Sequence, residues 1–190
     1  MPHAELLAPH PAARRTGTSQ PLTPALATLV AEIGAACGGA PGAMKDQVIA
    51  ALQTAVAQAG LLTADQRLPQ RGCYARHLMH SDPAGRFSIV AIVWGAGQFS
   101  PPHAHHTWCA YAVHENALDE TLYAWDVASA TAQPARAEVR SPGYGCFAYS
   151  GLDQIHRLGN SGSRPAISIH VYGVERERVA TDVNRVVQVA

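Results

Sequence analysis

The sequence has no excess of charge of either sign, because its 190 residues contain 14 lysines and arginines against 14 aspartates and glutamates. Nucleic acids and anionic membranes attract basic proteins, so the composition gives no reason to expect either as a partner. The chain also lacks a run of about 18 apolar residues, which a transmembrane helix requires, and its N-terminal stretch lacks the apolar segment of a signal peptide. We therefore expect a soluble cytoplasmic protein whose partners are small molecules. The sequence leaves its oligomeric state open.

The cysteines are scattered, and none forms a C-x-x-C pair with another: they are Cys37, Cys73, Cys109 and Cys146. Zinc ribbons and secreted disulfide scaffolds need paired spacings, so this arrangement excludes both readings. It favours a reducing compartment.

The length of the chain suits one domain with a hydrophobic core of its own. We expect a flexible N-terminus over residues 1–22 and a single domain over 23–190. Within that domain, helices are predicted over about 23–70 and a β-barrel over about 71–190.

Two segments of the first part carry apolar residues at helical spacing. Residues 23–37 follow this pattern, and Thr23 is a suitable N-cap. A second helix is predicted over 43–60, with Gly60 as its C-terminal break. A short helical turn is expected over 63–68.

The later part of the chain is rich in β-branched and aromatic residues separated by Gly, Pro, Asn and Asp, which is typical of short strands. The clearest runs are 87–94, 107–113, 120–125 and 166–173. Many short strands at such spacing predict a sandwich or a barrel, and closure into a barrel removes exposed sheet edges.

The stretch HAHHTW contains three histidines within four positions. Side chains two apart in a strand point to the same face, so His103 and His105 converge, whereas His106 points away. A third imidazole is available from His156, beyond an intervening hairpin. Taken by itself, the H-x-H pair could also be incidental.

The surroundings of these histidines resemble the two metal motifs of the cupin superfamily of small β-barrels. Five residues separate Gly97 from His103-x-His105, and three residues separate His156 from Asn160. This resemblance implies a cupin-type barrel, or jelly roll, with an N-terminal helical segment.

A typical cupin carries a glutamate ligand shortly after the second histidine, and this sequence does not. The corresponding residues are Trp108, Cys109 and Ala110. A ferrous ion held by neutral imidazoles alone keeps its full charge, which suits a substrate that brings an anionic donor such as a thiolate.

Two further segments carry polar residues at strand spacing. In AISIHVYG, Ser168, His170 and Tyr172 share one face and apolar residues share the other. In GCYARHLMH, Tyr74 and Arg76 share a face, and an arginine inside a barrel requires an anionic partner such as a substrate carboxylate. The alternatives are a solvent-facing strand for the first set and a surface arginine for the second.

Together, four separated pieces resemble the cysteine dioxygenase family of thiol dioxygenases, in particular its bacterial arginine-type members. The pieces are Y-x-R, the W-G-x-G-x5-H-x-H block, H-R with a downstream asparagine, and S-x-H-x-Y, which cover roughly residues 73–173. The resemblance implies Fe(II) as cofactor and the conversion of L-cysteine and O2 to cysteine sulfinic acid, a step of cysteine catabolism.

The resemblance also implies roles for individual residues. The metal ligands would be His103, His105 and His156. Arg76 and Tyr74 would bind the substrate carboxylate. Tyr172 would hydrogen-bond the dioxygen substrate, His170 would orient the Tyr172 hydroxyl, and Ser168 would fix the imidazole.

The sequence departs from the family pattern near the first motif. Ala104 replaces the aspartate of the usual HDH, which is not a ligand, so we expect metal binding to persist. Cys109 stands where most bacterial members have glycine. It is either the partner of Tyr172 in a thioether cross-link, as in animal members, or a buried small hydrophobe. Residues 114–117 replace a short glycine turn, and we interpret them as a hairpin connection without a catalytic part.

The sequence leaves alternatives open for both the substrate and the activity. Arg76 is typical of relatives that act on cysteine, but Arg176 and Arg178 keep 3-mercaptopropionate or mercaptosuccinate open as substrates. A non-catalytic cupin that binds a metal or a small ligand as a sensor is the alternative outside enzymes.

Overall fold

A computed structural model describes residues 22–40 and 42–190 of the chain. The first helix, α1 (Pro24–Gly38), confirms the expectation for 23–37, and its N-cap is Thr23, whose Oγ1 accepts the amide of Leu26 at 3.2 Å. The flexible N-terminus predicted over 1–22 lies, except for Leu22, outside the described residues. Among the helices that the structure describes, none is long and apolar enough to cross a membrane.

The second helix is shorter than its apolar pattern predicts. Helix α2 (Met44–Val56) ends before Gly60, because the chain turns after Ala57. After this turn Leu61 and Leu62 lie in the hydrophobic core, where both are buried. A 3₁₀ turn, Asp65–Arg67, follows within the predicted 63–68.

The remainder of the domain forms two five-stranded sheets whose paired strands run antiparallel. The helix-covered sheet has the order β1 (Ala75–Ser81), β2 (Ser88–Trp94), β9 (Ala166–Tyr172), β4 (Cys109–Glu115) and β7 (Gly145–Ala148). The second sheet has the order β10 (Asn184–Val186), β3 (His103–His105), β8 (Gly151–Gly159), β5 (Leu118–Asp126) and β6 (Thr131–Arg140). A second 3₁₀ turn spans Arg176–Arg178.

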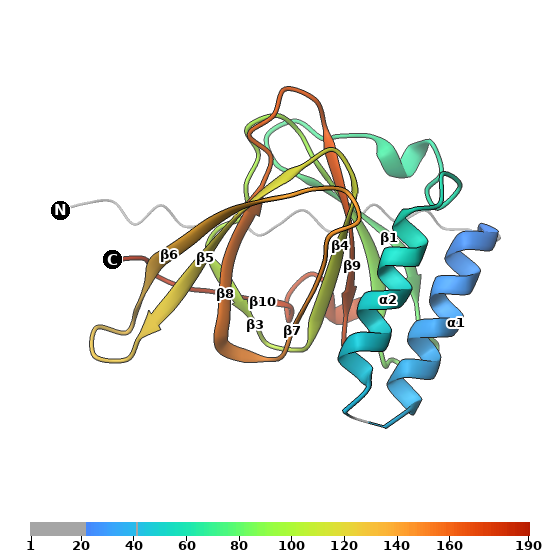
Figure 1. The fold of residues 1–190 in the computed structure, drawn as a ribbon, viewed down its shortest axis with the longest axis horizontal. Helices are drawn as coiled ribbons and strands as arrows, with labels where there is room; N and C mark the ends of the chain where they lie inside the picture. Colours follow the sequence, from blue (N-terminus) through green and yellow to red (C-terminus); the bar gives the residue numbers. More distant parts are fainter. Residues whose placement is uncertain (1–21, 41) are drawn as a thin grey trace.

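Helices α1 and α2 lie side by side against the outer face of the helix-covered sheet (Figure 1). The apolar face of β9 packs into this layer, with Ile167, Ile169 and Val171 in one core cluster with Leu29 and Leu52. The opposite face of β9 therefore points between the two sheets, into the barrel. Every residue of β9 is buried, because one face is covered by helices and the other by the second sheet.

Strand β6 was not predicted by hydrophobic alternation. Most of its residues are exposed, and it forms a hairpin with β5 that extends away from the rest of the barrel (Figure 1). The apolar residues that alternate with charged ones over 135–140 are themselves exposed, so pairing with β5, and not burial of an apolar face, defines this strand.

Truncation of Leu52 tests the packing of the helices on the sheet. Its side chain is fully buried in the core, so Leu52→Ala is expected to lower the free energy of unfolding by about 2 to 5 kcal/mol. Leu68, which is 58% exposed, is the matched control, and Leu68→Ala should change stability by no more than about 0.5 kcal/mol. Urea denaturation of both variants measures the difference, and equal losses would contradict this packing.

Candidate metal centre

Three histidines converge between the two sheets. His103 and His105 occupy the two ends of β3 and share one face, and His156 of β8 is the direct cross-strand partner of His103. The ring centroids lie 4.7 to 5.3 Å apart, and one nitrogen from each ring lies within 4.8 Å of the other two. His106 is exposed and outside this cluster, as its opposite orientation predicts.

The cluster is buried, which determines its protonation. Burial, followed by the neighbouring charge of His156, lowers the pKa of His103 to about 3. The same two causes lower the pKa of His105 well below its usual value. His103 and His105 are therefore neutral at pH 7, and each offers a lone pair, which is the form that binds a metal.

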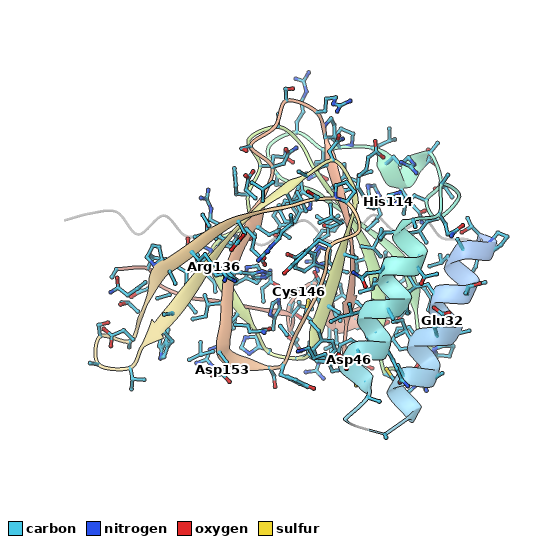
Figure 2. All side chains as sticks on the ribbon, viewed as in Figure 1. Glu32, Asp46, His114, Arg136, Cys146 and Asp153 are labelled. Carbon is cyan, nitrogen blue, oxygen red and sulfur yellow. The ribbon has the colours of Figure 1, made fainter. Side chains whose placement is uncertain are left out.

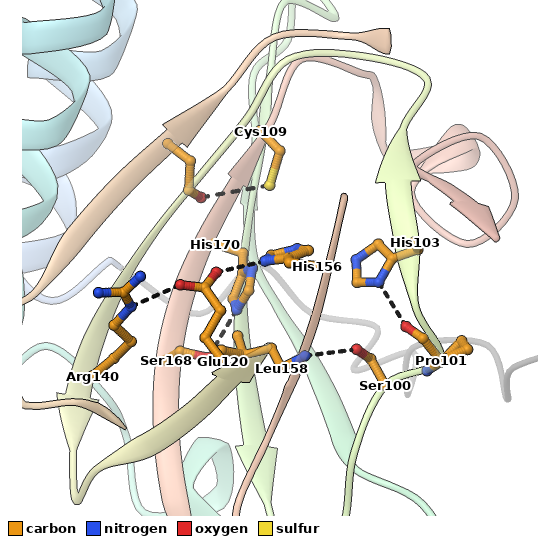
Figure 3. Close-up of polar contacts among 11 residues, drawn as sticks. Ser100, Pro101, His103, Cys109, Glu120, Arg140, His156, Leu158, Ser168 and His170 are labelled. Atoms are coloured by element: carbon orange, nitrogen blue, oxygen red, sulfur yellow. Dashed lines mark hydrogen bonds and ion pairs between the residues drawn. The ribbon is translucent and has the colours of Figure 1, made fainter. Parts of the chain in front are cut away.

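Hydrogen bonds behind two of the rings select the nitrogen that faces the cluster (Figure 3). His103 Nδ1 lies 2.9 Å from Pro101 O, and His156 Nδ1 lies 2.7 Å from Glu120 Oε1. Both partners only accept hydrogen bonds, so each Nδ1 carries a hydrogen, and Nε2 is the nitrogen that remains available to a metal. A set of three imidazole donors, two of which have Nδ1 fixed by a hydrogen bond, fits a divalent transition metal.

Glu120 was not predicted to take part in the site. It lies on β5 with a side chain only 1% exposed, and Arg140 of β6 donates from Nε to its other oxygen at 2.7 Å. Burial alone would raise the pKa of Glu120, but the hydrogen bonds from His156 and Arg140 hold it below its usual value. A glutamate at the inward position between Leu118 and Leu122 was the available sequence signal.

The predicted polar line on β9 faces the barrel interior. Ser168 Oγ lies 2.8 Å from His170 Nε2 and accepts a hydrogen bond from Trp94 Nε1 at 2.9 Å. The rings of His170 and Tyr172 are stacked, with centroids 5.7 Å apart. All three β9 residues are buried, so the alternative of a solvent-facing strand is wrong. The contribution of Trp94 was not predicted.

Arg76 and Tyr74 lie at the same cavity as the histidine cluster. The cavity wall includes both residues together with Tyr172 and, unpredicted, Asn184 of β10. Arg76 Nη2 donates to Val179 O at 3.0 Å, and its guanidinium carbon lies 5.9 Å from the centre of the Tyr172 ring. Arg76 is therefore half-buried on the edge strand β1, and it contributes to the wall of the cavity.

The two arginines that left other substrates open do not line the cavity of the histidine cluster. Arg176 and Arg178 belong to the exposed 3₁₀ turn after β9, and Arg178 Nε pairs with Asp182 at 2.7 Å.

Cys109 and Tyr172 are direct cross-strand partners on β4 and β9. Both are buried, and burial raises the pKa of the Cys109 thiol and of the Tyr172 hydroxyl. Opposite residues in an antiparallel pair have Cβ atoms about 4.5 to 5.5 Å apart, so the two side chains are neighbours. All four cysteines are free in the structure.

Asn160 joins the two sequence motifs. Its backbone N–H donates to Gln98 O, its backbone carbonyl accepts from Gly97, and its side-chain amide donates to Trp94 O at 2.9 Å. Gly97 adopts a φ of +74°, which favours glycine. The asparagine after His156 thus fixes the turn that leads to β3.

A second, larger cavity of about 310 Å³ lies on the other side of His105 and His156. Its wall includes Glu120 and Arg140, and also Arg136, Cys146 and Asp153, which Figure 2 labels on β6, β7 and β8.

Two solved structures of other proteins are similar to this one over most of their own length. An uncharacterized protein with a double-stranded β-helix domain from Klebsiella pneumoniae is 16% identical, covers 70% of this chain and 94% of its own, and gives a TM-score of 0.50. The protein TT1209 from Thermus thermophilus is 17% identical and covers 60% of this chain and 96% of its own, with a TM-score of 0.45. At 16% identity the first likeness concerns the fold alone, which is the predicted cupin-type barrel.

Residues 66–179 match the family model described as cysteine dioxygenase type I, over more than half of the chain. This segment holds the histidine cluster, Arg76, Tyr74 and the polar line of β9. The chain therefore belongs to the cysteine dioxygenase type I family.

Proposed function

We propose that the protein is an iron-dependent thiol dioxygenase that converts L-cysteine and O2 to cysteine sulfinic acid. The observation that carries this proposal is the position of Arg76 at the same cavity as His103, His105 and His156. A cluster of three imidazoles with an arginine beside it suits a small substrate that has both a thiol and a carboxylate.

The ligands in this proposal are His103, His105 and His156, without a carboxylate among them. Neutral ligands leave the charge of Fe(II) uncompensated, which favours an anionic sulfur donor from the substrate. Fe(II), when bound, would lower the pKa of the thiol and hold sulfur and dioxygen as neighbours.

Arg76 would bind the substrate carboxylate through two parallel N–H donors, with Tyr74 beside it. The bond from Arg76 Nη2 to Val179 O holds the guanidinium in place and leaves further N–H groups for the substrate.

Tyr172 would donate a hydrogen bond to dioxygen, because its raised pKa keeps the hydroxyl protonated at neutral pH. His170 stacks on the Tyr172 ring, and Ser168 with Trp94 fixes the His170 imidazole. Both oxygen atoms of O2 enter the product, so the sulfur supplies all the electrons and no external reductant is consumed.

Metal binding is the first requirement of the proposal. His103→Ala is expected to lose most of the affinity for Fe(II) or Co(II), whereas His106→Ala should bind as wild type does, because His106 is exposed outside the cluster. Isothermal titration of the metal-free variants with Co(II) under anaerobic conditions measures both. Equal affinity in the two variants would contradict the assignment of the ligands.

Substrate choice is tested by steady-state kinetics of the Fe(II) protein, with oxygen uptake matched to sulfinate formation. Arg76→Gln is expected to lower kcat/KM for L-cysteine by an amount equivalent to about 2 to 5 kcal/mol, because the substrate carboxylate loses its charged partner. Arg178→Gln, in the exposed turn, is the control and should act as wild type does.

The same assay separates the alternatives. One alternative is that 3-mercaptopropionate or mercaptosuccinate is turned over faster than L-cysteine, and that Arg178→Gln or Arg176→Gln loses this activity. That result would identify the faster thiol as the substrate in place of L-cysteine. Metal binding without oxygen uptake for any small thiol would instead support the ligand-binding cupin.

The pairing of Cys109 with Tyr172 favours the thioether over a free buried thiol. After aerobic incubation with Fe(II) and L-cysteine, we expect the intact mass to fall by about two hydrogens after full reduction of any disulfides, since a thioether forms by loss of one hydrogen from each side chain. Cys109→Ser should abolish this loss and Cys146→Ser should keep it. An unchanged wild-type mass would show that Cys109 is only a buried hydrophobe.

A further inference from the structure

The three histidines of the cluster differ in what lies behind them. His103 donates to the neutral carbonyl of Pro101, and His105 Nδ1 is buried without a hydrogen-bond partner among the described residues. His156 Nδ1 donates to a carboxylate, that of Glu120. Only His156 therefore receives negative charge through its outer nitrogen.

Glu120 is held in place from two sides. Its Oε1 accepts from His156 and its Oε2 accepts from Arg140, each at 2.7 Å (Figure 3). The Arg140 guanidinium in turn lies over the Tyr144 ring, with its carbon 4.2 Å from the ring centre. A buried carboxylate without such partners would be strongly unfavourable, so these contacts keep Glu120 ionised beside the imidazole.

Strand register gives this contact its geometry. Glu120 on β5 pairs with Leu158 on β8, and the next inward pair along the strands is Leu122 with His156. Glu120 and His156 are thus diagonal neighbours on the same inner face. On its other side Glu120 pairs with Glu138 of β6, whose carboxylate contacts Arg136 and Arg140.

We propose that Glu120 is a positioning residue of the metal centre. It fixes the tautomer and the orientation of His156 and makes its Nε2 a stronger donor, because negative charge at Nδ1–H is transmitted through the ring. No carboxylate is among the three proposed ligands, but the carboxylate of Glu120 acts on the centre through its hydrogen bond to His156. This inference rests on the proposed metal site, but not on the reaction or the substrate.

Glu120→Gln tests the charge, because glutamine keeps an acceptor for His156 Nδ1–H but is neutral. The expected result is an affinity for Co(II) about 10- to 100-fold weaker than in wild type, with a changed Co(II) absorption spectrum. Glu138→Gln removes the same charge from the same cluster without contact to His156, and it should bind Co(II) as wild type does. Competition with a chelator in the absence of O2 and thiol measures both.

Arg140 allows a structural effect to be separated from a positioning effect. Arg140→Gln removes one of the two donors to Glu120 but keeps the bond between Glu120 and His156, so it should lose less Co(II) affinity than Glu120→Gln although its Tm falls. If Glu120→Gln alone does not fold, the double variant Glu120→Gln/Arg140→Gln removes both buried charges together. Its affinity should be about 10- to 100-fold weaker than that of Arg140→Gln.

The large cavity beside Glu120 offers a chemical rescue. Because the carboxylate lines a space of about 310 Å³, a small anion can reach the gap that Glu120→Ala leaves. Formate is expected to restore part of the Co(II) affinity of Glu120→Ala, whereas formamide, which has a similar shape but no charge, should not.

Three outcomes would overturn the inference: equal Co(II) affinity of Glu120→Gln and wild type, an equal loss in Arg140→Gln, or equal rescue by formamide and formate. None of these readouts requires turnover, so a protein without dioxygenase activity could still confirm the role of Glu120. Conversely, weaker Co(II) binding in Glu120→Gln than in Glu138→Gln and Arg140→Gln, together with an active wild type, would support both proposals.

Discussion

The antiparallel pairing of β3 with β8 is the constraint on which the centre depends. It places His103 directly opposite His156, and the period of two along β3 adds His105 to the same face. A shift of one residue in this register would turn His156 outward and dissolve the cluster. Asn160, just after β8, is hydrogen-bonded to the turn before β3. The spacing between His156 and Asn160 therefore helps to fix the register of β3 on β8, and not only to supply a ligand.

Burial turns this arrangement into a site with defined charges. In the space between the sheets His103 and His105 stay neutral, and the ionised groups are those with a partner, such as Glu120 with Arg140. The cluster presents uncharged donors, while a negative charge lies behind one ring and the positive charge of Arg76 lies at the same cavity. A positive charge therefore lies at the cavity, and a negative charge lies behind one of the three rings.

Much of this could be predicted from the sequence, because it depends on local pattern. The alternation in AISIHVYG placed Ser168, His170 and Tyr172 on one face, and the H-x-H spacing separated His106 from its neighbours. Glu120 and Arg140 could not be predicted, since their contact arises only when β5 is aligned between β8 and β6. The predicted end of α2 at Gly60 was wrong for a similar reason. The helix ends at Val56, and the chain then turns and buries Leu61, which depends on tertiary packing and not on helix propensity.

The polar character of β6 has a consequence for the protein in a crowded solution. This strand forms an edge of the second sheet, and an edge with free N–H and C=O groups can pair with a strand of another molecule. Pro134 removes one donor, and Arg136 and Glu138 place exposed or half-exposed charges along the strand. The proline and the charged side chains of β6 thus discourage edge-to-edge aggregation.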